Sequence, residues 1–295
     1  MPALVAEGPA RAAIANAIDA QSQRLATELA ATAKRPKRGR VHRLRVATRR
    51  LLAALRLASA AGSAVPKVAT KRLEKLLEAL SPLRDAQVME SGLKALPEGE
   101  VEAAVLERAA RERRRQRART AKRLARFDAS ELIEAIGSVQ VSMADGASPQ
   151  PTLLGGLALT GHLAREQLTI EVGRARARQL SPHELHQLRL LLKSYRYSLE
   201  ILAEQLSPTA AGLLETTTQL QDELGAAHDS EVLAKAVTEY AEAHDRNAQR
   251  LSESLARTSR EAHARAAERL ARAELRWPLG PEPQPAGLSR TKSPP

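Results

Sequence analysis

Apolar residues recur at intervals of three and four positions along almost the whole chain, with polar residues between them. No segment shows the strict apolar–polar alternation that is typical of a half-buried β-strand. The segments with this spacing are rich in Ala, Leu, Arg, Glu and Gln, which are strong helix formers. The pattern therefore predicts an all-α protein.

Pro, Gly and Ser interrupt the helical spacing and divide the chain into predicted helices. Ser181, Pro182 and Glu184 have the pattern of a capping box with proline at the first helical position, and Ser81-Pro82 is expected to begin a helix in a similar way. The predicted helices span residues 9–33, 40–60, 67–80, 82–96, 98–127, 131–139, 153–178, 182–205 and 208–224, with one or two more over 226–275.

The sequence also repeats itself at a spacing of 144 residues. The repeat predicts two halves of about five helices each, over residues 1–140 and 153–277, joined by a linker over 141–152. We expect each half to be an antiparallel bundle of the four-helix type, and the two bundles to be related by internal pseudo-two-fold symmetry. A Pro- and Gly-rich tail, 278–295, is expected to be disordered. The matched pairs include His42 with His186, Arg45 with Arg189, Arg49 with Lys193, and Asp85 with Asp229.

The chain is strongly basic, with 46 Lys and Arg against 34 Asp and Glu, a formal net charge of +12. This charge favours a polyanionic partner, which could be nucleic acid, an anionic membrane surface or an inorganic phosphate polymer. Only five aromatic residues are present, too few for a base-stacking platform. There is no cysteine, no apolar run long enough to cross a bilayer and no signal-peptide pattern, so we expect a cytoplasmic protein without membrane insertion.

Basic side chains form one stripe on a predicted helix in each half. Residues 34–56 hold ten Lys and Arg and no acidic residue. The periodicity predicts that apolar stripes on the opposite sides, such as Leu44, Leu51 and Leu55, pack into the bundles. The basic stripes are His42, Arg45, Arg49, Leu52 and Arg56 in the first half, and His186, Arg189, Lys193 and Arg196 in the second.

A third basic helix face contains Arg108, Arg111, Arg115, Lys122 and Arg126. A charge run of this kind is as often a solvated helix face as a binding surface, and both readings stay open for it.

The residue types in the two stripes suit a phosphate ligand. An arginine fork can bind two oxygens of one phosphate, and a histidine adds a donor whose charge responds to the anion beside it. The alternative for the histidines is burial against Asp85 or Asp229. These two acids follow Arg84 and His228 near predicted helix starts, and we expect them to brace the Arg or His side chains of the stripes.

At these positions the chain resembles the CHAD domain family. The resemblance rests on VHRLRVATRRLLAALRL and LSPLRDAQV in the first half, and on LHQLRLLLKSYRYSLEIL and LQDELGAAHDSEVL in the second. It implies that residues 9–277 form one domain of two four-helix bundles with a basic pore or groove that binds inorganic polyphosphate. Gln87 departs from the family pattern, which usually has an acid there. The family's signature positions fall on His42, Arg45, Arg49 and Arg50, and on His186, Arg189, Lys193 and Arg196.

The leading hypothesis is a non-enzymatic protein that binds inorganic polyphosphate, with possible association with polyphosphate granules. No phosphate-binding glycine loop or nucleophile elbow is present, and His183 and His186 lack the spacing of a zinc site, so we expect no metal and no cofactor. Two alternatives stay open: a nucleic-acid-associated helical protein, and a polyphosphate-processing enzyme with a metal at Asp85 or Asp229. No feature of the sequence indicates an oligomeric state.

Overall fold

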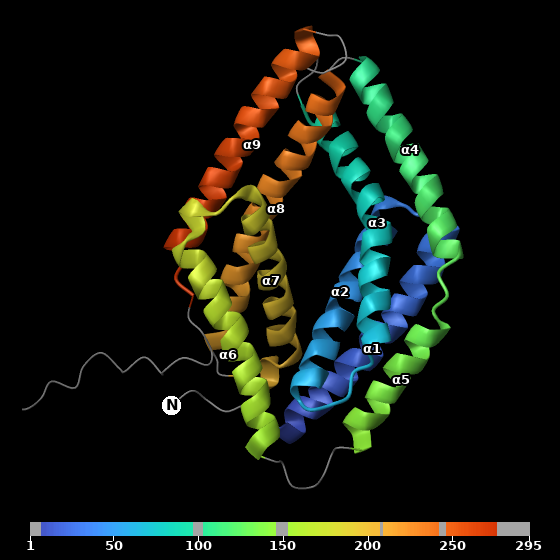
Figure 1. Ribbon diagram of the computed structural model, residues 1–295, viewed down its shortest axis with the longest axis vertical. Helices are drawn as coiled ribbons and strands as arrows, with labels where there is room; N and C mark the ends of the chain where they lie inside the picture. Colours follow the sequence, from blue (N-terminus) through green and yellow to red (C-terminus); the bar gives the residue numbers. More distant parts are fainter. Residues whose placement is uncertain (1–6, 97–102, 146–152, 207–208, 242–245, 276–295) are drawn as a thin grey trace, which may run out of the picture.

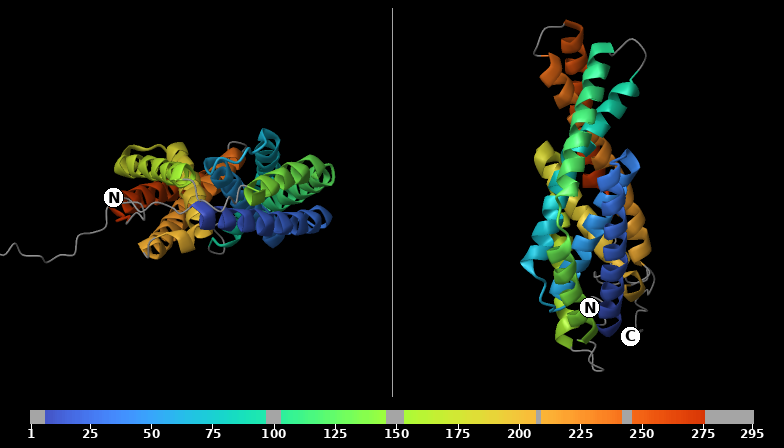
Figure 2. Two further views of the ribbon diagram at one scale, coloured as in Figure 1. Left: turned by 90° about the horizontal axis from the view of Figure 1, so that it is seen from below. Right: turned by 90° about the vertical axis from the view of Figure 1, so that its right-hand side faces the viewer.

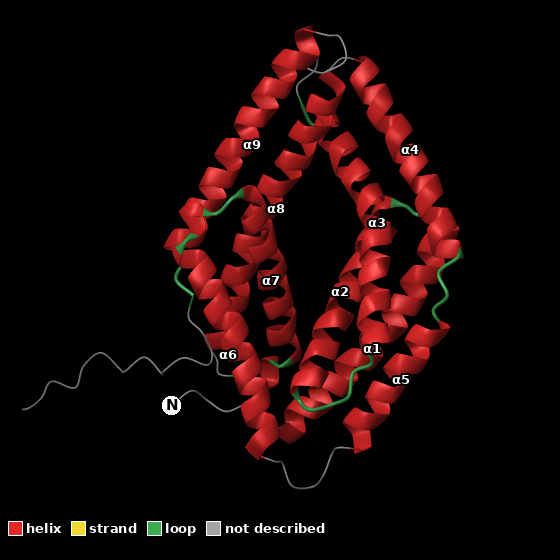
Figure 3. Ribbon diagram, in the orientation of Figure 1, coloured by secondary structure: helices red, strands yellow, loops and turns green. Residues whose placement is uncertain are grey.

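The computed structural model describes residues 7–96, 103–145, 153–206, 209–241 and 246–275, and these residues form helices joined by short loops. Figure 3 shows no strand among them. The predicted all-α class is therefore confirmed. The predicted tail over 278–295 lies outside the described residues, as does the linker beyond residue 145.

The helices of the first half are α1 (Glu7–Lys34), α2 (Arg38–Ala60), α3 (Lys67–Lys94), α4 (Ala103–Ala125) and α5 (Ser130–Asp145). Those of the second half are α6 (Leu153–Ala175), α7 (Pro182–Ile201), α8 (Thr209–Ala241) and α9 (Arg246–Arg272), with short 3₁₀ turns η1 (Ala177–Gln179) and η2 (Ala203–Gln205). The described residues thus give five helices to the first half and four to the second, whereas about five were predicted for each.

The two halves lie side by side along the length of the molecule (Figures 1 and 2). In Figure 1, α1 to α5 occupy the right side and α6 to α9 the left side. The halves meet where α2 packs on α7 and where α3 packs on α8. The sequence repeat matches this arrangement, because α2 begins at Arg38 and α7 begins 144 residues later, at Pro182. The pseudo-two-fold relation of the two halves stays a prediction.

A predicted break at Pro82 is wrong, because α3 runs through the proline as one helix. Proline removes one backbone hydrogen bond from a helix and crowds the preceding turn. Leu80 and Leu83, on either side of it, are both fully buried, so packing against the core holds the helix together here. The Ser81 hydroxyl donates a hydrogen bond to the carbonyl oxygen of Leu77 in the turn before the proline (2.9 Å).

Two further boundaries differ from prediction for the same reason. Helix α8 continues through Gly225, where a break was expected, because Leu224 and Ala227 are both buried. Helix α5 continues to Asp145, so residues 141–145 are helical and not part of a linker; Met143 in this segment is buried in the core. The capping box at Ser181 is confirmed: its hydroxyl accepts from the backbone N–H of Glu184, and the Glu184 carboxylate accepts from the backbone N–H of Ser181.

One continuous hydrophobic core runs through both halves, and a second, smaller cluster lies where the ends of α3, α4, α8 and α9 come together. The smaller cluster lies at the top of Figure 1. Its residues come from both halves, so it joins the halves near the ends of α3 and α8. The halves are therefore in contact at two places, between α2 and α7 and between α3 and α8. Its fully or nearly buried members include Leu93, Val105, Ala109, Leu233 and Val237.

Candidate anion-binding site

The predicted apolar stripes of α2 and α7 are buried as expected. Leu44, Leu51 and Leu55 of α2 have no solvent exposure, and Leu192 and Leu199 of α7 have none. Because these side chains point into the core of their own half, the basic stripes on the opposite sides of α2 and α7 point toward the boundary between the halves.

The structure brings the two basic stripes together at this boundary. Arg49 of α2 lies close enough to His186, Arg189 and Lys193 of α7 to lower the pKa of each of them. Lys193 in turn lowers the pKa of His42 across the same boundary. Basic side chains from both halves therefore lie close together in one group.

Helices α3 and α8 each add one basic side chain to the site. Arg84 of α3 lies close enough to four other members to lower their pKa values: His42, Arg45, Arg49 and Arg189. The ring of His228 on α8 lies 4.3 Å from that of His186, centroid to centroid. We call the resulting group the central cluster; it consists of His42, Arg45, Arg49, Arg84, His186, Arg189, Lys193 and His228.

The surroundings of the central cluster disfavour the charged forms of several of its side chains. Burial, followed by the neighbouring cations, lowers the pKa of Lys193 to about 7 and that of Arg45 to about 10. Burial and the adjacent His228 lower the pKa of His186 to about 4. A cluster of cations that lower one another's pKa is incompletely neutralised by the protein, and such clusters are candidates for binding sites.

Asp85 and Asp229, the predicted bracing acids, both lie near the central cluster, where Glu231 also pairs with His228 (3.7 Å). Asp85 raises the pKa of Arg45, and Asp229 raises that of Arg189, while both raise the pKa of His228. Burial raises the pKa of Asp85 itself. Both acids lie well inside α3 and α8, so the expectation that they stand near helix starts is wrong. Their proximity to arginine and histidine fits the predicted bracing role.

Local structure positions two of the arginines. The Arg45 guanidinium donates to the Ser81 hydroxyl (2.9 Å) and to the Leu77 carbonyl oxygen (3.3 Å), just before Pro82. Arg189 lies against α8 at Gly225, where an added Cβ would stand 3.1 Å from its Nη2 atom. A glycine at this position lets the guanidinium approach the helix backbone.

Three predicted site residues contact other protein groups between the halves. Arg50 and Arg196 both form ion pairs with Glu200, at 2.9 and 3.0 Å, and both guanidinium groups lie over the ring of Tyr197. Arg56 donates a hydrogen bond to the Ser194 hydroxyl (3.0 Å). Arg50 and Arg56 of α2 thus contact α7 of the other half, whereas Arg196 pairs within α7, and all three are engaged by protein groups.

The basic residues of α4 lie apart from the central cluster. Arg111 and Arg115 are exposed and pair with Glu107 and Glu112 of the same helix, at 3.1 and 3.6 Å. Lys122 is exposed one turn before the end of α4. The structure does not bring any of the three into the group formed by α2, α3, α7 and α8.

The sequence reasoning missed His228 as a member of the site and gave Arg84 only a supporting role. Both could have been found, because the repeat of 144 residues places His228 on Arg84 and Asp229 on Asp85. In both halves a basic residue is followed by an acid at equivalent positions. This repetition indicates a shared role for Arg84 and His228, which neither half would indicate alone.

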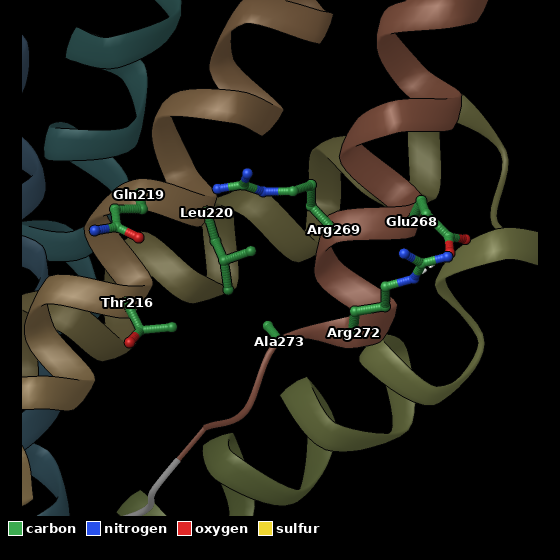
Figure 4. A pocket seen from close by; sticks show the side chains of 7 residues that line it. All are labelled: Thr216, Gln219, Leu220, Glu268, Arg269, Arg272 and Ala273. Carbon is green, nitrogen blue, oxygen red and sulfur yellow. Dashed lines mark ion pairs between the residues drawn. The ribbon is translucent and has the colours of Figure 1, made fainter.

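A small cavity of about 280 Å³ lies elsewhere, between α8 and α9 (Figure 4). Arg272 on its rim pairs with Glu268 at 2.5 Å, and Arg269 pairs with Glu223 at 2.7 Å. Its arginines are therefore matched by carboxylates, unlike those of the central cluster. Within the described ranges, no group of three or more His, Asp or Glu side chains is arranged to hold a metal ion.

The fold agrees with comparisons to known proteins. A family model described as the CHAD domain matches residues 16–238, well over half of the chain. The chain belongs to the CHAD domain family, which confirms the resemblance found in the sequence. It is similar in fold to the crystal structure of the CHAD domain from the plant Ricinus communis, with 19% sequence identity, a TM-score of 0.68 and coverage of 93% of this chain and 95% of that chain. The comparison with curated proteins found no match.

Proposed function

We propose that this protein binds inorganic polyphosphate through the central cluster. The observation that carries the proposal is the convergence of basic side chains from α2, α3, α7 and α8, with Arg49, Arg189 and Lys193 each lowered in pKa by burial and by their neighbours. Phosphate oxygens would neutralise these charges and accept their hydrogen bonds. Membership of the CHAD family supports the proposal, because CHAD domains are linked to polyphosphate binding in general.

The position of the cluster favours a thin, flexible polyanion over nucleic acid. All of its side chains except that of the exposed His42 are partly buried between packed helices, where a rigid duplex cannot follow. A single strand would need large aromatic side chains for its bases, and no Phe, Tyr or Trp is among the members of the cluster. Polyphosphate carries a charge on every unit and no bases, so it matches a narrow arginine-lined site. In the cell, a protein of this kind would bind at polyphosphate granules.

We propose that the protein holds the chain without cleaving it. Asp85 and Asp229 both interact with arginines of the cluster and with His228. A metal-dependent reaction would need these acids to leave the cations that they brace. A test for Mg²⁺-dependent release of phosphate from polyphosphate should therefore show no turnover.

The binding proposal is tested by calorimetric titration with long-chain polyphosphate at two salt concentrations. Replacing Arg49 and Arg189 by Gln should reduce affinity by about 100-fold or more, because two charge-assisted hydrogen-bond donors are lost. Wild-type affinity should fall steeply with salt, as it does for other polyanion-binding proteins.

The matched control is Arg24→Gln/Arg257→Gln, which removes the same charge from two exposed positions on α1 and α9. Its affinity should stay within a few-fold of wild type. Equal losses in both double variants would show that net charge, and not the central cluster, determines binding. Displacement of polyphosphate by duplex DNA at equal charge concentration would favour the nucleic-acid alternative.

A further inference from the structure

A second basic surface lies at the end of the molecule where α3, α4 and α8 come together, at the top of Figure 1. It is a cleft of about 710 Å³. Met89 and Leu93 of α3 and Val237 of α8 form part of its apolar lining, while Arg108, Arg111 and Arg115 of α4 line it on another side. These arginines belong to the basic helix face that the central cluster leaves unused.

The cleft continues the helix faces that carry Asp85 and Asp229, the two acids beside the central cluster. On α3, Met89 and Leu93 follow Asp85 at steps of four residues, so all three lie on one side of the helix. On α8, Ala236 follows Asp229 by seven residues, which is again the same side. At about 1.5 Å per residue, the cleft begins about 6 Å along α3 from Asp85.

The ion pairs at the cleft are weak enough to be replaced by a ligand. The side chains of Arg111 and Glu107 are 60% and 64% exposed, and those of Arg115 and Glu112 are 61% and 36% exposed. Exposed pairs of this kind contribute at most about 1 kcal/mol. Glu112 and Glu239 also line the cleft, so the lining has three arginines against two acids.

We propose that this cleft is a second subsite for the polyphosphate chain, so that chains long enough to reach both the central cluster and the cleft bind more tightly than short ones. The inference rests on the function proposed above for the central cluster. Two sites on one linear ligand make the second contact intramolecular, and the gain in affinity then depends on chain length. The cleft thus gives the protein a preference for long chains.

The test compares tripolyphosphate with long-chain polyphosphate by calorimetric titration. Arg111→Gln/Arg115→Gln should lower the affinity for long chains by about 10-fold and reduce its dependence on salt, since two phosphate contacts are lost. Its affinity for tripolyphosphate should equal that of wild type. The matched control is Arg114→Gln/Arg123→Gln, which removes two exposed arginines of α4 that do not line the cleft, and it should bind both ligands as wild type does.

Unchanged long-chain affinity in Arg111→Gln/Arg115→Gln would overturn the second subsite, as would an equal loss in the Arg114→Gln/Arg123→Gln control. A loss of duplex DNA binding alone would assign the cleft to nucleic acid and also overturn it. These outcomes leave the central cluster unaffected, because tripolyphosphate binding that disappears in Arg49→Gln/Arg189→Gln would still support it. Failure of the wild type to bind either chain length would instead refute the function proposed for the cluster.

Discussion

At the residue scale, Lys193 shows how burial and neighbouring cations lower the pKa of a side chain in the central cluster. Burial lowers its pKa most, and Arg189, Arg49 and Arg45 lower it further, to about 7 from an ordinary value of 10.5. Lys193 is therefore only partly charged near neutral pH in the free protein. A phosphate ligand would favour its charged form, so the same side chain that destabilises the free protein is suited to binding an anion.

The pKa of Lys193 predicts a pH-dependent effect of Lys193→Met. Between pH 7 and 10.5 the unfolded chain holds more protons at this lysine than the folded protein does, so the lysine's contribution makes the free energy of unfolding rise with pH across that window. Removing the lysine should therefore raise stability by about 1–2 kcal/mol at pH 7, which corresponds to a rise in Tm of roughly 2–3 °C.

Thermal unfolding of both proteins at pH 7 and at pH 10 would check this prediction. The gain in Tm should shrink at pH 10, because the lysine of the unfolded chain is then losing its proton as well. Lys235→Met, at an exposed position on α8, is a control that should change Tm little at either pH. A lower Tm for Lys193→Met at pH 7 would contradict the burial of an incompletely neutralised cation.

At the scale of the element, Gly225 of α8 lies against Arg189 of the central cluster. Glycine inside a helix lowers stability relative to alanine by roughly 1 kcal/mol. Here an added Cβ would meet the Nη2, Nε and Cζ atoms of Arg189 at 3.1, 3.5 and 3.7 Å. Since these atoms belong to the end of a flexible side chain, Gly225→Ala should preserve the fold while displacing the guanidinium.

We therefore expect Gly225→Ala to separate stability from binding. Its Tm should equal or exceed that of wild type, whereas its affinity for polyphosphate should fall several-fold as Arg189 moves. Gly161→Ala on α6 is the matched control, because an added Cβ there meets nothing within 4 Å. The control should gain stability and bind normally; wild-type affinity in Gly225→Ala would show that the position of Arg189 does not matter.

The elements also show which parts of the structure a single sequence can predict. The start of α7 was predictable because Ser181 carries its capping signal within four residues. The continuity of helices at Pro82 and Gly225 was not, because it depends on core packing by residues from other helices. The basic stripes were found from periodicity alone, but their partners were not: the pairing of Arg50 with Glu200 joins helices from different halves.

At the scale of the whole molecule, the contacts between the halves determine whether the central cluster exists. Its members come from both halves, so the cluster forms only while α2 stays against α7. Glu200 lies at this contact, where it pairs with Arg50 of the other half and with Arg196 of its own helix. One carboxylate thus joins two cations across the boundary, and both guanidinium groups also lie over the ring of Tyr197.

Glu200→Gln should weaken this junction. The change leaves Arg50 and Arg196 close together without the carboxylate, and the side chains of the Arg50–Glu200 pair are only 31% and 29% exposed. We expect a loss of about 1–2 kcal/mol in the free energy of unfolding, between the values for exposed and buried ion pairs. Urea denaturation measures the loss, and exposed Glu74→Gln on α3 is the control that should unfold as wild type does.

Polyphosphate should restore much of the stability that Glu200→Gln loses, because a ligand that binds only when the halves are together stabilises the folded state. Repeating the urea titration with saturating polyphosphate should therefore raise the midpoint of both proteins. A smaller rise in Glu200→Gln than in wild type would link the junction between the halves to the binding site, and equal rises would show that the site still forms in the variant. If polyphosphate raised neither midpoint, the ligand would not bind the folded state in preference to the unfolded one, and this would contradict the proposed function.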